Sequence, residues 1–76
     1  MKTINLNKAT DYEYRGNGIK LYHNFMVMAF MPKHTMIYWR ADSIEEAKNW
    51  LESRKDEIGE FDPDIFKAEI VAINWV

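Results

Sequence analysis

Side chains that could bind a metal ion are few in this sequence. His23 and His34 are the only histidines, no cysteine is present, and the two histidines fall in different predicted elements. Zinc and the transition metals need three or four such ligands held close together. We expect His34 to be an exposed turn residue and His23 to be partly buried and hydrogen-bonded. We therefore predict no metal site and no bound cofactor.

The sequence also lacks a recognisable catalytic nucleophile. Neither Ser43 nor Ser53 has an evident base, and there is no cysteine and no Gly-x-Ser-x-Gly elbow. Residues 16–18, Gly-Asn-Gly, begin like a dinucleotide-binding motif, but the third glycine is missing and a predicted strand follows. We predict no catalytic residue and expect that the protein is not an enzyme.

Carboxylates are concentrated in residues 52–64, which hold six of them. Their spacing is not that of a calcium-binding loop, and Pro63 stiffens the place where such a loop must wrap around the ion. One interpretation is a surface for a basic partner, or a mimic of the phosphate charge of nucleic acid. The simpler interpretation, which we favour, is a solvated helix end and loop.

Aromatic and basic side chains alternate in the N-terminal half, which is typical of sheets that stack single-stranded bases. The candidate nucleic-acid surface comprises Tyr12, Tyr14, Arg15, Lys20 and Tyr22. Six basic residues over forty positions form a thin patch, and no RNP-like run is present. The other interpretation is that these aromatics form the core of a small domain. Single-stranded nucleic-acid binding is therefore our alternative hypothesis for function.

The charge of the chain is divided unevenly along its length. Residues 1–40 carry six Lys/Arg and two acids, a net charge of +4, whereas residues 41–76 carry four Lys/Arg and ten acids, a net charge of −6. The two halves could meet partners of opposite charge. They could equally attract each other within the fold, and we favour this interpretation because exposed charges are usually only solvated.

The length and composition predict one small domain over residues 1–76. The hydrophobic fraction of 47% and the eleven aromatic residues are typical of a folded chain. No run approaches the roughly 18 apolar residues that a membrane span needs, and the N-terminal residues do not resemble a signal peptide. We expect a cytoplasmic protein without a membrane partner.

The stretch from residue 25 to residue 40 is the centre of the predicted fold. Two apolar runs, 25–31 and 35–40, flank Pro32-Lys33-His34, which is the pattern of a β-hairpin. The first run has no polar side chain on either face, so we expect both of its faces to be covered.

The residues before this hairpin predict shorter strands. Ile4 and Leu6 alternate with asparagines, and residues 12–23 form a second hairpin around the turn 16–18. His23-Asn24 is either a two-residue turn or a bend within one long strand over 19–31. We favour the turn, which gives an antiparallel meander of four strands through Arg40.

The residues after the central hairpin predict one helix and one strand. Ser43 and Glu46 have capping-box spacing, and the apolar periodicity predicts a helix over 43–58 with Gly59 as its C-cap. Asp62-Pro63-Asp64 can cap a single turn. Alternation over 67–75 predicts a closing strand, with a second helix as the alternative.

The predicted fold class is α+β: an antiparallel β-sheet, made of the meander and the C-terminal strand, with one principal α-helix on one face. The second face is covered either by the chain's own ends, Ile4 and Leu6 or Ile65 and Phe66, or by another protein or a second copy. Our hypothesis for function is a non-enzymatic protein–protein interaction module that forms a homodimer through this apolar face. The candidate interface comprises Met26, Met28, Phe30, Met36 and Tyr38.

Overall fold

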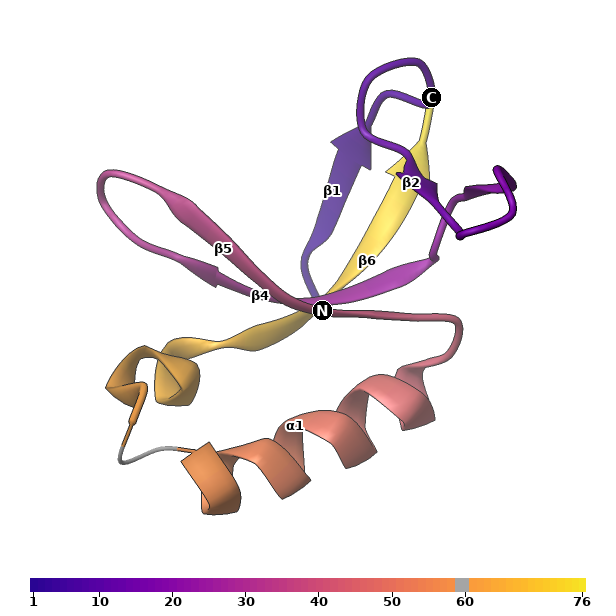
Figure 1. Ribbon diagram of the computed structural model, residues 1–76. Coiled ribbons are helices and arrows are strands. Elements are labelled where there is room, and N and C mark those ends of the chain that lie inside the picture. The colour runs from indigo at the N-terminus through magenta and orange to yellow at the C-terminus, as the bar shows by residue number, and fades with distance from the viewer. Residues whose placement is uncertain (59–60) are drawn as a thin grey trace.

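The computed structural model describes residues 1–58 and 61–76, and it confirms an α+β fold with one helix packed against a sheet (Figure 1). The strands are β1 (Thr3–Leu6), β2 (Glu13–Tyr14), β3 (Lys20–Leu21), β4 (Phe25–Phe30), β5 (Thr35–Ala41) and β6 (Glu69–Trp75). The helices are α1 (Ile44–Ile58) and the short 3₁₀ helix η1 (Pro63–Lys67). None of the helices in these ranges is long and apolar enough to cross a membrane.

The sheet is mixed, and the predicted antiparallel meander is wrong. Its strand order is β1–β6–β4–β5, with β1 parallel to β6 and the other two pairs antiparallel. Strands β2 and β3 form a hairpin of their own, so β3 does not pair with β4 as the turn at His23-Asn24 would require.

The composition of β6 explains why β6 pairs with β4, where the predicted meander had β3. Residues 70–73 are apolar without interruption, and such a strand is stable where neighbours cover both of its faces. The return strand of the N-terminal hairpin instead places Lys20 on one face, which suits a strand exposed to water on that side. The predicted strand over 67–75 is thereby confirmed, but its position inside the sheet was not foreseen.

The helix begins as the capping box predicts. The Ser43 Oγ accepts a hydrogen bond from the Glu46 backbone N–H at 3.1 Å, and the Glu46 carboxylate accepts one from the Asp42 N–H at 3.1 Å. A cap of this kind contributes about 1 kcal/mol to stability. Ala47 is fully buried against the sheet, in agreement with the apolar periodicity of the predicted helix. The predicted C-cap, Gly59, lies outside the described residues.

The predicted turn after the helix is also present. The carboxylate of Asp62 caps η1 by accepting from the Asp64 N–H, and Pro63 stands in its first turn. Ile65 is fully buried, whereas Phe66 is largely exposed. Of these two residues, only Ile65 contributes to the core.

Two apolar clusters lie on opposite faces of the sheet. On the face that α1 covers, the buried residues are Val27, Ala29, Ala41, Ala47 and Ala68. On the other face they are Met26, Met28, Val71 and Ile73, with Ile4, Leu6 and Trp75 packed against them. The N-terminal strand therefore helps to cover the second face, which is one of the two arrangements expected from the sequence.

Candidate interaction surface

The structure separates the five predicted interface residues into two groups. Met26 and Met28 are only 1% and 4% exposed and belong to the core, so they cannot contact a partner directly. Phe30 and Met36 are each 40% exposed, and Tyr38 is partly buried. Only the residues near the β4–β5 turn are therefore accessible. This turn projects away from the rest of the sheet (Figure 1).

Two further large apolar side chains lie beside Phe30 and Met36. Ile37 and Trp39 are 39% and 40% exposed, and we call the four residues Phe30, Met36, Ile37 and Trp39 the apolar strip. The strand pairing places Met36 and Trp39 on the helix side of the sheet and Phe30 and Ile37 on the other side. Met36, Ile37 and Trp39 thus lie on both sides of the edge strand β5, whereas Phe30 lies on the inner strand β4, where the Lys2 ammonium is 4.0 Å from its ring.

A bulge in β5 sets the direction of these side chains. The pairing with β4 shifts between Val27 and Met28, so that Tyr38 is an extra residue between Ile37 and Trp39. A bulge of this kind turns two consecutive side chains toward the same face. The sequence does not reveal it, because the apolar run 35–40 reads as an ordinary strand.

Trp39 is held against the helix by ring stacking. Its indole lies 5.4 Å from that of Trp50 with an angle of 10° between the planes, and the Arg54 guanidinium lies 5.7 Å from the Trp50 ring. The stack fixes the Trp39 ring at the outer edge of the helix face.

Tyr38 is tied to the segment that follows the helix. Its hydroxyl donates a hydrogen bond of 2.9 Å to the Asp62 carboxylate. Burial raises the pKa of the Tyr38 hydroxyl to about 12, with further contributions from the Asp62 hydrogen bond and the charges of Asp62 and Asp64. The hydroxyl is therefore a hydrogen-bond donor at neutral pH, and its role is to join β5 to the start of η1.

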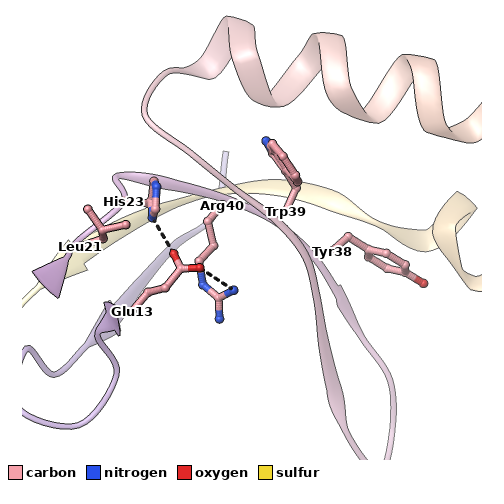
Figure 2. Close-up of a pocket in the computed structure, with 6 residues that line it drawn as sticks. All are labelled: Glu13, Leu21, His23, Tyr38, Trp39 and Arg40. Atoms are coloured by element: carbon pink, nitrogen blue, oxygen red, sulfur yellow. Dashed lines mark ion pairs between the residues drawn. The ribbon is translucent and has the colours of Figure 1, made fainter. Parts of the chain in front are cut away.

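A pocket of about 370 Å³ lies where the β2–β3 hairpin meets β5 (Figure 2). It is lined by Glu13, Leu21, His23, Tyr38, Trp39 and Arg40. Trp39 and Arg40 point to opposite sides of β5, Trp39 toward the helix and Arg40 toward Glu13.

The carboxylate of Glu13 is close to both of the basic side chains that line this pocket. One of its carboxylate oxygens lies 3.3 Å from the His23 Nδ1 and the other 3.9 Å from the Arg40 guanidinium. The direction of the His23 contact does not suit a hydrogen bond, so the buried Nδ1 has no hydrogen-bond partner in the part of the chain that the structure describes. His23 is partly buried, as predicted, but the predicted hydrogen bond is not present at this nitrogen. His34 is exposed, as predicted.

The predicted nucleic-acid residues gather on and beside the β2–β3 hairpin. The Tyr12 and Tyr14 rings meet edge to face at 4.9 Å, and the Lys20 ammonium lies 4.3 Å from the Tyr12 ring. Tyr14 is 54% exposed. Tyr22 instead packs on Trp75 at 5.1 Å, and Arg15 is exposed in the turn. Of the three tyrosines, only Tyr14 is therefore exposed, and one edge of the Tyr12–Tyr14 pair is packed.

Within the described ranges, no group of three or more His, Cys, Asp or Glu side chains is placed to hold a metal ion. No protein-family model, curated protein or solved structure matches this chain. Its function must therefore be argued from its own geometry.

Proposed function

We propose that this protein is a non-enzymatic protein-interaction module that self-associates through the outer edge of β5. The observation that carries the proposal is the position of Met36, Ile37 and Trp39, three of the four residues of the apolar strip, on an edge strand of seven residues. An edge strand presents unpaired N–H and C=O groups to which another strand can bind, and soluble proteins usually protect long apolar edges from such pairing.

The distribution of the apolar strip favours contact along the edge over contact with one face. Phe30 and Ile37 lie on one side of the sheet, and Met36 and Trp39 lie on the other. A partner docked on either face would leave half of these side chains in water. A strand added beside β5 would approach both halves, and it would remove apolar area from water on both faces.

The test is the mass of the protein in solution, measured by light scattering after size exclusion at several concentrations. The wild type should form a dimer, and Ile37→Asp should weaken the dimer about tenfold or more, because its carboxylate would be placed in an apolar contact. Ile19→Asp is the matched control, since Ile19 is 54% exposed on the β2–β3 hairpin. A wild type that stays monomeric at all concentrations contradicts the proposal.

A second candidate function, single-stranded nucleic-acid binding, is favoured by the clustering of Tyr12, Tyr14 and Lys20. It would give binding to a short oligonucleotide that weakens steeply with salt and is lost in Tyr14→Ala. Fluorescence anisotropy at two salt concentrations measures this directly. The absence of binding at low salt would exclude this second function and leave the first untouched.

A further inference from the structure

We propose that two copies of this chain pair β5 with β5 in antiparallel orientation, about a two-fold axis at Met36. In this arrangement, the Pro32–His34 turn of each copy lies at the pocket beside Glu13 of the other. The proposal rests on the proposed function, since it names the partner and the register of the same edge.

The backbone of β5 defines which groups are available for a partner. The Met31 N–H donates to the His34 C=O at 2.9 Å, which makes Phe30 and Thr35 a pair without hydrogen bonds between them. Because hydrogen-bonded and non-hydrogen-bonded pairs alternate in an antiparallel ladder, Ala29–Met36 is the next hydrogen-bonded pair. The N–H and C=O groups of Thr35 and Ile37 therefore point away from β4.

The bulge limits where a second strand can pair. Pairing along an edge requires regular pleating, and β5 is regular from Thr35 to Ile37 and bulged at Tyr38. When a two-fold axis relates the strands and Thr35 of each copy faces Ile37 of the other, the outward N–H and C=O groups of both residues form hydrogen bonds. This register places Met36 on the axis, opposite Met36 of the second copy. Methionine side chains adapt readily to such a contact.

The same register brings opposite charges together at both ends of the paired strands. The turn before β5 carries Lys33, and no ion pair is seen for it among the described residues. Beside the far end of β5 lie two carboxylates, that of Glu13 in the pocket and that of Asp42, whose side chain is 81% exposed. The Arg40 guanidinium lies 3.9 Å from Glu13, so two carboxylates stand against one guanidinium and this end remains net negative.

In an antiparallel arrangement, the positively charged turn before β5 of each copy faces the negatively charged far end of β5 of the other copy. Each Lys33 then approaches the Tyr38–Arg40 segment of the second copy, where the pocket of about 370 Å³ opens beside Glu13. A parallel arrangement would bring like ends together and leave the Lys33 turns side by side. The charge pattern thus favours a second copy in the antiparallel orientation, with an isologous contact that closes after two chains.

Disulfide cross-linking tests the register, because the chain has no cysteine of its own. The two Met36 residues would form a non-hydrogen-bonded cross-strand pair with Cα atoms about 4.5 Å apart, which lies in the range that a disulfide bridges. Under mild oxidation at low protein concentration, Met36→Cys should give about tenfold more covalent dimer than Thr3→Cys, because paired thiols have a high effective concentration. Thr3 is the matched control on β1, at the opposite edge of the sheet.

Light scattering of the same variants under reducing conditions separates the two proposals. If the reduced variants and the wild type are dimers, but Met36→Cys cross-links no better than Thr3→Cys, the register is wrong and self-association stands. If the wild type is a monomer, both proposals fail. Should Met36→Cys not fold, a mixture of Thr35→Cys and Ile37→Cys proteins replaces it, and the two should cross-link to each other more than either does to itself.

Discussion

Tyr38 stabilises the fold of its own chain, although it lies on the edge strand that we propose pairs with a second copy. Its ring packs against the cluster under the helix, and its hydroxyl bonds to the Asp62 carboxylate. Alternation along the strand places this residue on the same face as Met36, and the structure agrees, since both lie on the helix side of the sheet. Tyr38 is nevertheless partly buried and bonded to Asp62, so that it stiffens the edge rather than meeting a partner.

The raised pKa of Tyr38 predicts a loss of stability in alkali. Because its folded pKa of about 12 exceeds the ordinary tyrosine pKa of 10.0, the folded state holds this proton more tightly than the unfolded state does. The contribution is complete below pH 10 and disappears as the pH rises through about 12. We expect the free energy of unfolding in urea to be higher for the wild type than for Tyr38→Phe at pH 10. This difference should shrink as the pH rises to about 12. A constant difference contradicts the assignment, and Tyr14→Phe is the control for loss of an exposed hydroxyl.

Met26 and Met28 were predicted as interface residues but lie in the core, because alternation within one strand does not show what covers each face. The sequence correctly indicated that both faces of this strand are apolar and covered. It could not indicate that Ile4 and Leu6 help to cover them, because that contact joins residues far apart in the chain. For this reason the candidate interface included two core residues and omitted Ile37 and Trp39.

At the scale of elements, signals contained within a few residues were the ones that the sequence predicted well. The start of α1 depends on Ser43 and Glu46, and the start of η1 depends on Asp62 and Pro63. Each signal needs only neighbouring backbone groups, so each can be interpreted without knowledge of the fold. The β4–β5 hairpin was predicted for the same reason.

The order of strands in the sheet depends on long-range pairing and was predicted less well. The choice between β3 and β6 as the neighbour of β4 is decided by burial on both faces, since β6 is apolar over 70–73 and β3 is not. The parallel pairing of β1 with β6 joins the two ends of the chain. The bulge at Tyr38 had no sequence signal such as a glycine or proline, so the exposed apolar edge could be located only in three dimensions.

At the scale of the whole molecule, the two edges of the sheet are protected to different degrees. The β1 edge is a strand of four residues in which Asn5 alternates with apolar residues, and Lys8 follows it. Short polar edges resist strand addition. The β5 edge is longer and carries Met36, Ile37 and Trp39 of the apolar strip, and its main protection is the bulge at Tyr38. Of the two edges of the four-stranded sheet, the β5 edge is therefore the one suited to pairing, which favours a closed dimer over an extended polymer.

Dimerisation through this edge predicts that thermal stability depends on protein concentration. When folding is linked to association, a tenfold higher concentration adds about 0.7 kcal/mol per chain, which for a domain of this size raises the Tm by about 3–5 °C. Scanning calorimetry of the wild type at two concentrations should show this shift, and Ile37→Asp should show a smaller shift or none. A wild-type Tm that is the same at both concentrations, in a range where light scattering detects the dimer, would mean that association does not stabilise the fold. The dimer would then dissociate before the chains unfold, which contradicts the predicted linkage between pairing at this edge and folding.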